Sequence, residues 1–226
     1  MKLVIFDLDQ TLVEVIPVHD RTAQAVFQKH FGVDVRMTEV DFAGKSLIEN
    51  FLGMARLRGI SESEVKAKMG QLLEDYDRMF VQILPKDATR HILPGVGRLL
   101  EELSHTDNIV VLYTGDSAVV GNAILQAANL DKYFRFCFFG TEVASRGDMV
   151  RLAIGNAECL TKKEFKDKDI VIIGDSIRDV ECGKQFNALI IAVTTGSHSR
   201  EELLRLGPDY IFPDLRDYRK ILQVIG

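Results

Sequence analysis

Two aspartates, Asp7 and Asp9, lie two residues apart near the start of the chain, directly after the apolar run from Leu3 to Phe6. An unbroken apolar run is typical of a strand buried on both faces of a parallel sheet, and such sheets bind ligands at the carboxyl ends of their strands. Two neighbouring carboxylates resist joint ionisation unless a cation lies between them or one of them holds a proton. The pair therefore indicates a functional site, with a strand-ending turn as the structural alternative.

Polar side chains also follow two later apolar runs. Thr114 comes after the run at 108–113, and Asp175 comes shortly after the run at 169–173, with Asp179 four residues further on. Because the carboxyl ends of strands meet where the strand order reverses, we expect one pocket with four acids and a hydroxyl. This donor set contains no His or Cys, which favours Mg²⁺. A metal-bridged anion beside a carboxylate nucleophile indicates phosphoryl transfer through an aspartyl-phosphate intermediate.

The spacing of apolar residues predicts the elements that position these groups. Continuous apolar runs predict strands at 3–6, 108–113, 136–140, 169–173, 188–193 and 210–212. Spacings of three and four residues predict helices at 20–31, 47–55, 61–83, 96–103, 124–130 and 149–157. Ser61 with Glu64 three residues later predicts a capping box at the start of the helix at 61–83. Strands and helices that alternate in this way predict an α/β fold with a doubly wound parallel sheet.

The region between the first two predicted strands differs from the rest of the chain. Residues 14–85 carry helical patterns and no strand pattern. We therefore predict an all-helical cap domain at 14–85, inserted into an α/β core domain made of residues 1–13 and 86–226.

Composition restricts the class of protein. The chain has 226 residues, 46% of them hydrophobic, and a formal net charge of -5. No basic run is longer than Lys162-Lys163, which argues against nucleic acid or an acidic membrane as a partner and favours a small molecule. Three widely spaced cysteines indicate neither a disulfide framework nor a C-x-x-C metal site. With no signal peptide or membrane-spanning run predicted, we expect a cytoplasmic protein, either a monomer or a homodimer.

Three short motifs carry a resemblance to a known family. They are Asp7-Leu8-Asp9-Gln10-Thr11-Leu12, Tyr113-Thr114-Gly115-Asp116 and Gly174-Asp175-Ser176-Ile177-Arg178-Asp179. In this order, each at a predicted strand end, they resemble the haloacid dehalogenase-like hydrolase superfamily, and within it the phosphoglycolate-phosphatase-like branch. The resemblance covers essentially the whole chain and implies a helical cap where residues 14–85 lie.

The resemblance also implies the roles of the acids. Asp7 would attack phosphorus as the nucleophile. Asp9 would protonate the leaving oxygen and later take a proton from the hydrolytic water. Asp7, the backbone carbonyl of Asp9 and Asp175 would hold Mg²⁺, with Ser176 and Asp179 supporting these ligands from behind. Because Asp9 is present, a dehalogenase is disfavoured, since release of halide needs no proton.

Phosphate binding is the role that the resemblance implies for the second motif. Thr114 and the backbone amide of Gly115 would donate to phosphate oxygens, as fixed donors directed at developing charge.

The chain departs from the family pattern in two places. Gln10 stands where Gly is common, so we expect a turn that does not rely on a conformation open only to glycine. Between the second and the last of these motifs the family has a further one, which usually offers Lys followed by Pro, and this chain has Ser145-Arg146-Gly147 instead. Arg146 is our candidate replacement, since its guanidinium can pair with Asp7 and with the phosphate. Arg151, one helical turn further on, is the competing candidate.

Other residues of the cap region offer weaker signals. Gly44-Lys45-Ser46 is not a P-loop, because that motif needs Gly at position 39, where this chain has Glu. Lys45 is predicted either to contact a second anionic group of the substrate or to lie in solvent. The five histidines show no metal-ligand spacing.

These observations lead to one main hypothesis and three alternatives. The main hypothesis is a Mg²⁺-dependent phosphatase that acts on a small phosphorylated metabolite resembling phosphoglycolate. A phosphomutase of the β-phosphoglucomutase type would share every core residue. A phosphorylation-dependent receiver or a non-catalytic binding module fits less well, because receivers carry no cap and all the predicted metal ligands are present. The sequence does not identify the phosphate ester.

Overall fold

The computed structural model describes residues 1–226 and contains one sheet of six parallel strands. The strand order is β3-β2-β1-β4-β5-β6. The strands are β1 (Leu3–Phe6), β2 (Ile109–Thr114), β3 (Phe136–Phe139), β4 (Ile170–Gly174), β5 (Leu189–Val193) and β6 (Tyr210–Phe212). All six predicted strands are present, with ends that differ by at most one residue. The α/β fold class is confirmed.

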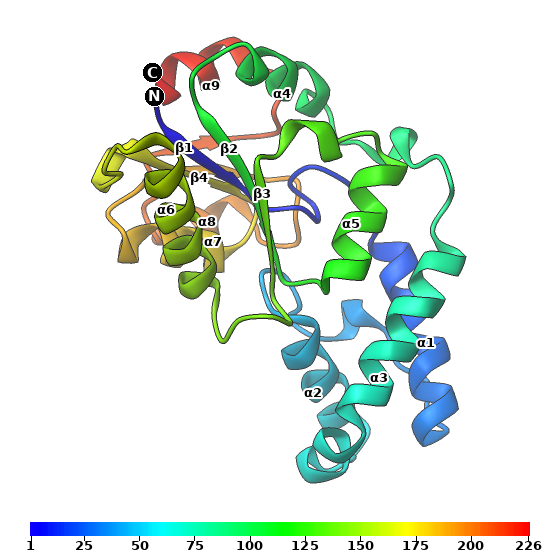
Figure 1. Cartoon of the computed structure of the whole chain (residues 1–226). Helices are drawn as coiled ribbons and strands as arrows, with labels where there is room; N and C mark the ends of the chain where they lie inside the picture. The colour runs from blue at the N-terminus through cyan, green and yellow to red at the C-terminus, as the bar shows by residue number, and fades with distance from the viewer.

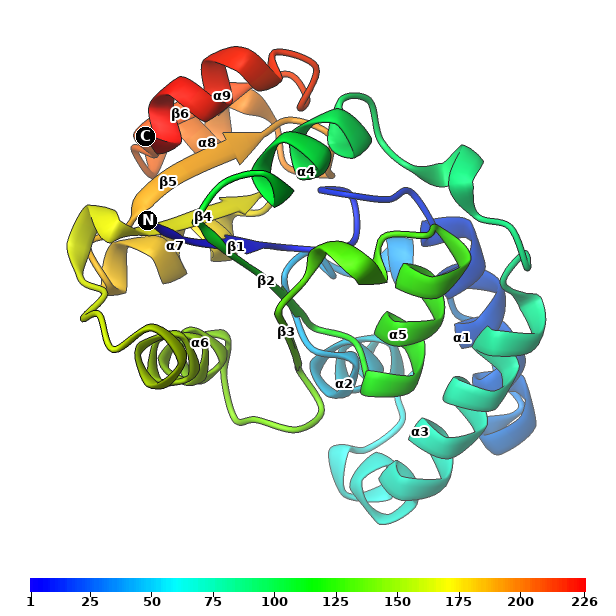
Figure 2. The ribbon, with the colours of Figure 1, turned by 45° about the horizontal axis from the view of Figure 1, so that its top comes forward.

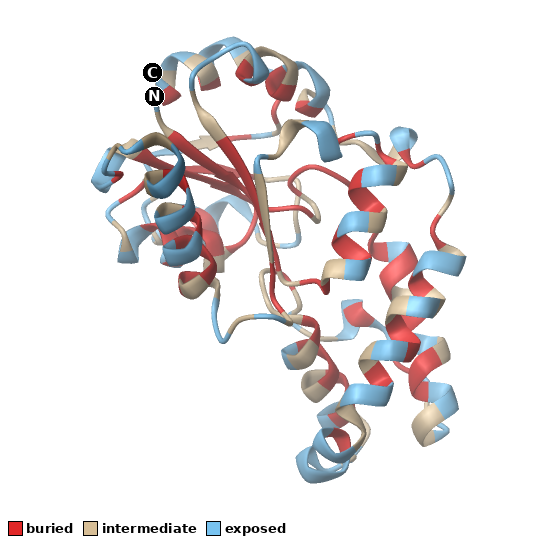
Figure 3. Ribbon diagram, viewed as in Figure 1, coloured by how far each residue is buried: buried red, intermediate tan, exposed pale blue.

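The central strand β1 is buried on both faces. Leu3, Val4, Ile5 and Phe6 are all fully buried, and Phe6 pairs in register with Leu112 of β2 on one side and with a residue of β4 on the other. Figure 3 shows the same burial along the middle of the sheet. Because β1 lies where the strand order reverses, its carboxyl end is the switch point at which doubly wound sheets bind ligands.

Nine α-helices surround the sheet and extend beyond it. They are α1 (Ile16–Phe31), α2 (Leu47–Leu57), α3 (Glu62–Ile83), α4 (Val96–Ser104), α5 (Ala118–Ala127), α6 (Arg146–Thr161), α7 (Ile177–Gln185), α8 (Arg200–Arg205) and α9 (Tyr218–Ile225). Apolar residues of α4, α5 and α9 share one buried cluster with one face of the sheet, and those of α6, α7 and α8 pack in clusters on the other face. Figure 2 shows α4 and α9 on one side of the sheet and α6 on the other. None of the helices combines the length and the apolar character needed to cross a membrane.

Helices α1, α2 and α3 project from the carboxyl edge of the sheet (Figure 1). Aromatic rings of the three helices pack together. The ring centroids of Phe27 (α1) and Phe51 (α2) lie 5.8 Å apart, and those of Phe51 and Tyr76 (α3) lie 5.2 Å apart. These buried side chains give the region an apolar core of its own that continues into the main core. The inserted helical region is therefore present as predicted, whereas its limits as a domain, residues 14–85, stay a prediction.

The structure differs from the sequence-based predictions at the start of α1 and at the start of α3. Helix α1 begins at Ile16, four residues before the predicted start, because Pro17 fits the first helical turn, where no backbone N–H is required. At the start of α3, the amide of Glu64 donates to the Ser61 hydroxyl, but the Glu64 side chain makes no return bond. The predicted capping box is therefore only half formed.

Candidate active site

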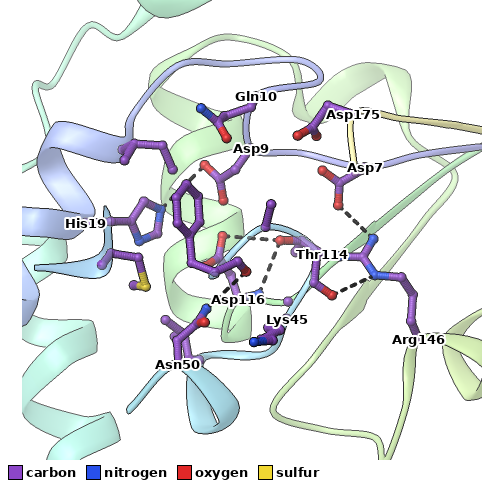
Figure 4. Close-up of a pocket in the computed structure, with 17 residues that line it drawn as sticks. Asp7, Asp9, Gln10, His19, Lys45, Asn50, Thr114, Asp116, Arg146 and Asp175 are labelled. Atoms are coloured by element: carbon purple, nitrogen blue, oxygen red, sulfur yellow. Dashed lines mark hydrogen bonds and ion pairs between the residues drawn. The ribbon is translucent and has the colours of Figure 1, made fainter. Parts of the chain in front are cut away.

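The polar residues that follow β1, β2 and β4 line one pocket at the carboxyl edge of the sheet (Figure 4). The pocket encloses about 450 Å³ of space, part of it open to solvent. It brings together seven predicted site residues, which are Asp7, Asp9, Lys45, Thr114, Gly115, Arg146 and Asp175. Ser176 and Asp179 lie behind these residues, buried and outside the lining of the pocket.

The first group in the pocket is a cluster of three buried acids. Asp7, Asp175 and Asp179 each present a carboxylate oxygen within 4.8 Å of the others, and all three are at most 5% exposed. Burial, followed by the negative charge of Asp179, raises the pKa of Asp7 to about 7. Burial and the charge of Asp7 likewise raise the pKa of Asp175 well above its ordinary value. A divalent cation bound by oxygen ligands would relieve this repulsion, so the donor set fits Mg²⁺.

Arg146, the first residue of α6, lies against this cluster. Its Nη1 atom lies 2.8 Å from Asp7 Oδ1 and 2.7 Å from Asp179 Oδ1. Its Nε donates a 3.3 Å hydrogen bond to the Gly44 carbonyl, and its Nη2 makes no hydrogen bond within the protein. Arg151, the competing candidate, instead pairs with Asp148 at the surface, where its side chain is 62% exposed. The structure therefore brings Arg146, and not Arg151, to the predicted site.

Asp179 holds the surrounding elements together. It accepts hydrogen bonds from the Tyr113 hydroxyl at 2.6 Å, the Ser176 hydroxyl at 2.6 Å and the Ser176 amide at 2.9 Å. Its own amide donates to Ser176 Oγ, which completes a capping box at the start of α7. This set of bonds fixes the helix that follows Asp175.

The second group in the pocket contains a histidine, although the sequence predicted none there. Asp9, His19 and Asp116 present ligand-type atoms within 4.8 Å of one another. His19 Nε2 lies 3.5 Å from Asp9 Oδ1, while Nδ1 lies 2.7 Å from the Tyr76 hydroxyl. The expectation of a pocket without histidine is therefore wrong. His19 lies near Asp9 because α1 starts at Ile16, which places His19 on its first turn, shortly after the end of β1. No motif spacing indicated this contact.

The charges of this second group are mutually dependent. Burial opposes a charge on His19, but the carboxylates of Asp9 and Asp116 outweigh burial and raise the pKa of His19 to about 9. Burial would raise the pKa of Asp9, yet the positive charge of His19 is the main effect that lowers it overall. These shifts favour an ionised Asp9 beside a protonated His19.

The turn after Asp9 is left-handed. Gln10 has φ 61°, and its amide donates a 2.7 Å hydrogen bond to the carbonyl of Val13. The hydroxyl of Thr195 donates to the Gln10 carbonyl at 2.5 Å. Glycine favours such a φ, but other residues can also adopt it, so the turn does not depend on a glycine-only conformation, and these bonds hold Gln10 on both sides.

The predicted phosphate donors lie where a loop of the cap region touches the sheet. Thr114 is 2% exposed, and its hydroxyl lies 3.3 Å from Asp116 Oδ2. A Cβ on Gly115 would come within 2.0 Å of the Lys45 carbonyl, and the Leu47 amide donates to the Gly115 carbonyl at 3.0 Å. Glycine is needed at position 115 because the two backbones meet there.

We call residues 41–46 the cap loop. Arg178 of α7 donates to the Ala43 carbonyl at 2.7 Å and pairs with Asp41 at 2.5 Å. Lys45 lines the pocket and lies 3.4 Å from Asp41. Helix α7 therefore carries both the buried acid Asp179 and Arg178, which binds the cap loop.

Comparison with known proteins identifies the family. Residues 4–193 match the model of the haloacid dehalogenase-like hydrolases. A phosphoglycolate phosphatase of Synechococcus elongatus is 27% identical over 93% of this chain and 92% of its own length. A pyrophosphatase PpaX of Listeria monocytogenes is also 27% identical, over 97% of this chain and 95% of its own.

Solved structures share the fold over the whole chain. A predicted phosphatase from Clostridium acetobutylicum superposes with a TM-score of 0.79 at 23% identity and covers 98% of each chain. A β-phosphoglucomutase from Clostridium difficile superposes with a TM-score of 0.81 at 14% identity, over 100% of this chain and 97% of its own. At these identities the likeness shows the fold alone.

Proposed function

The chain belongs to the haloacid dehalogenase-like hydrolases, and we propose that it is a Mg²⁺-dependent phosphatase that hydrolyses a small phosphate monoester through an aspartyl-phosphate on Asp7. The single observation that carries the proposal is the placement of Asp7 at the switch point, 2.8 Å from Arg146 and within one acid cluster with Asp175. The phosphatase names of the relatives support the reaction class.

Asp7 is the nucleophile in this proposal. One of its carboxylate oxygens forms a bond to phosphorus as the bond between phosphorus and the ester oxygen breaks. The guanidinium of Arg146 keeps Asp7 oriented and favours its ionised form. Asp7, the carbonyl of Asp9 and Asp175 would hold the metal, which when bound supplies positive charge that neutralises the acids and the phosphate.

Asp9 and His19 supply the proton that the leaving oxygen needs. An alkoxide leaves readily only if a proton reaches it during bond cleavage. His19 holds the shared proton in the free site, and negative charge develops on the ester oxygen beside Asp9 as the bond to phosphorus breaks. The proton then moves to Asp9, which gives it to the leaving oxygen. In the second step Asp9 takes a proton from water as that water attacks phosphorus and Asp7 is released.

Phosphate oxygens are bound from the second strand and from α6. The Thr114 hydroxyl and the Gly115 amide donate from the end of β2, and Arg146 Nη2 donates from the opposite side. These donors are fixed before substrate arrives, so they stabilise charge that develops on the phosphoryl oxygens without further reorganisation.

The cap loop closes the site in this proposal. Bonds from the Leu47 amide to Gly115 and from Arg178 to Ala43 seat the loop against the edge of the sheet. We propose that residues 14–85 move as a cap domain that opens to admit substrate and closes to exclude bulk water.

A phosphomutase would use the same core residues and return the phosphoryl group to a second hydroxyl. The two activities separate in one assay, in which a sugar phosphate is supplied and both free phosphate and the isomerised sugar phosphate are measured. We expect free phosphate.

The proposal is tested by the turnover of p-nitrophenyl phosphate with Mg²⁺. We expect release of phosphate by the wild-type protein and its loss in an Asp7→Asn variant. The matched control is Asp107→Asn, since Asp107 is exposed and remote from the pocket. Turnover that survives Asp7→Asn would refute the proposed nucleophile. A panel of small phosphate esters, including phosphoglycolate, then identifies the preferred substrate.

A further inference from the structure

Asn50, on the second turn of α2, has a buried oxygen without a partner. The residue is 5% exposed and lines the same pocket as Asp9 and Thr114 (Figure 4). Its Nδ2 donates a long hydrogen bond of 3.5 Å to the Phe42 carbonyl, while its Oδ1 accepts none. A buried acceptor left without a donor is unfavourable by about 1–3 kcal/mol, so Asn50 Oδ1 needs an explanation.

The orientation of the amide follows from its surroundings. If the amide were rotated by half a turn, Oδ1 would face the Phe42 carbonyl oxygen and two acceptors would repel each other. Oδ1 is therefore the atom that faces away from Phe42 and lacks a partner.

None of the other side chains that the region 14–85 contributes to the pocket offers a neutral hydrogen-bond acceptor without a partner. Most of them are apolar, namely Ile16, Met37, Phe42, Ala43 and Leu47. His19 and Lys45 are hydrogen-bond donors with acidic partners, Asp9 and Asp41. Among these side chains Asn50 is thus the neutral group with a free acceptor, on the side of the pocket opposite the ends of the strands.

We propose that Asn50 Oδ1 accepts a hydrogen bond from a hydroxyl group on the leaving group of the substrate. This inference rests on the proposed phosphatase function and refines its substrate class to phosphate esters of small polyhydroxy alcohols or sugars. A carboxylate offers no hydrogen to Asn50, so phosphoglycolate would leave this oxygen unsatisfied.

A pair of esters with equal carbon number tests the proposal. Glycerol 1-phosphate carries two hydroxyls and n-propyl phosphate carries none. We expect the wild-type protein to prefer glycerol 1-phosphate in kcat/KM by about 10- to 100-fold, the discrimination typical of one buried hydrogen bond. Phosphoglycolate, assayed beside them, is expected to rank below glycerol 1-phosphate.

Three variants test whether Asn50 causes the preference for glycerol 1-phosphate. Asn50→Leu keeps the approximate shape and removes the acceptor, so the preference should collapse toward equality. Asn50→Gln retains an amide oxygen on a longer side chain and should retain part of the preference. Asn156→Leu, on the exposed face of α6, is the matched control and should behave as the wild type. Thermal melts of each variant show whether it is folded.

A binding measurement keeps this inference separate from the proposed function. Calorimetric titration of the Asp7→Asn variant with both esters, with and without Asn50→Leu, reports the hydroxyl preference without turnover. If the wild type hydrolyses neither ester nor any other phosphate, the proposed function fails while the binding arm still tests Asn50. Equal affinity for the two esters, or a preference that survives Asn50→Leu, overturns the inference.

Discussion

The guanidinium of Arg146 lies 2.8 Å from the carboxylate of Asp7, although 139 residues separate them in the chain. The same Nη1 atom lies 2.7 Å from Asp179 Oδ1, so one nitrogen links Asp7, which follows β1, to Asp179 on α7. The arginine side chain is only 10% exposed. Its charge therefore acts where water screens little, and it aligns Asp7 and offsets part of the rise in the pKa of Asp7 that burial and Asp179 cause.

The first prediction concerns this arginine. Arg146→Met is expected to lower kcat/KM by about 100-fold or more, because a fixed donor to developing phosphoryl charge is lost. Arg146→Lys should recover part of the activity, since it restores charge without the planar donors. Arg151→Met is the control and should leave kcat/KM unchanged, because Arg151 lies at the surface. Steady-state kinetics on p-nitrophenyl phosphate provide the measurement, and equal effects of the two methionine variants would refute the assignment.

The second prediction concerns His19. His19→Gln keeps a polar group near Asp9 but cannot carry the proton, so kcat on alkyl phosphates should fall by about 10-fold or more. p-Nitrophenolate leaves without protonation, and its phosphate ester should lose much less. Rates on both substrates are compared with those of His105→Gln, whose side chain is 70% exposed. An equal loss on both substrates would show that His19 has a structural role only.

The third prediction links pH, metal and stability. The pKa of Asp7 is raised from 3.8 to about 7, first by burial and then by Asp179. A carboxyl whose folded-state pKa exceeds its unfolded value is favourable to folding below the unfolded value, and this contribution is lost as pH rises through the folded one. In the metal-free protein the contribution of Asp7 to the free energy of unfolding therefore declines between about pH 4 and pH 7.

Bound Mg²⁺ should reverse that decline. Saturating Mg²⁺ is expected to raise the melting temperature by about 5–10 °C at pH 8, and by much less at pH 5.5, where protons compete for Asp7. Asp7→Asn should reduce both the pH dependence and the response to Mg²⁺. Melting curves with EDTA or Mg²⁺ test this, and an equal effect of Mg²⁺ at both pH values would contradict it.

The fourth prediction concerns the seating of the cap loop. Arg178→Met removes the bonds to Ala43 and Asp41, so the closed site should form less readily and kcat/KM should fall by about 10-fold. Asp41→Asn should have a smaller effect, because the Asp41 side chain is 54% exposed and such pairs contribute little. Arg200→Met, at an exposed position of α8, is the control. If Arg178→Met changes the melting temperature but not kcat/KM, the bond is structural and unrelated to closure.

Much of this site could be predicted from the sequence because parallel strands end at a common edge. Asp7, Thr114 and Asp175 each follow an apolar run that forms a buried strand, so their positions along the chain determine their meeting. Arg146, the first residue of the helix that follows β3, was predicted differently, from the resemblance to the family's motif and not from a strand end.

Other features depend on how elements pack and left no local signal. His19 lies near Asp9 only because α1 begins at Ile16 and carries His19 on its first turn, and its Nδ1 is held by Tyr76 from α3. The left-handed conformation of Gln10 is held by Thr195, which is 185 residues away. The free oxygen of Asn50 depends on the path of the cap loop at Phe42. A periodic pattern indicates which face of a helix is buried, but not which residue of another element it meets.

Capture of the phosphorylated enzyme tests the central claim most directly. In an Asp9→Asn variant with p-nitrophenyl phosphate and Mg²⁺, the first step needs no proton, whereas the second lacks its base. We predict a burst of p-nitrophenol equal to the enzyme concentration, with the phosphoryl group found on Asp7 by peptide mass spectrometry. The absence of both burst and label while phosphate is still released, or a label on a different residue, would contradict the account.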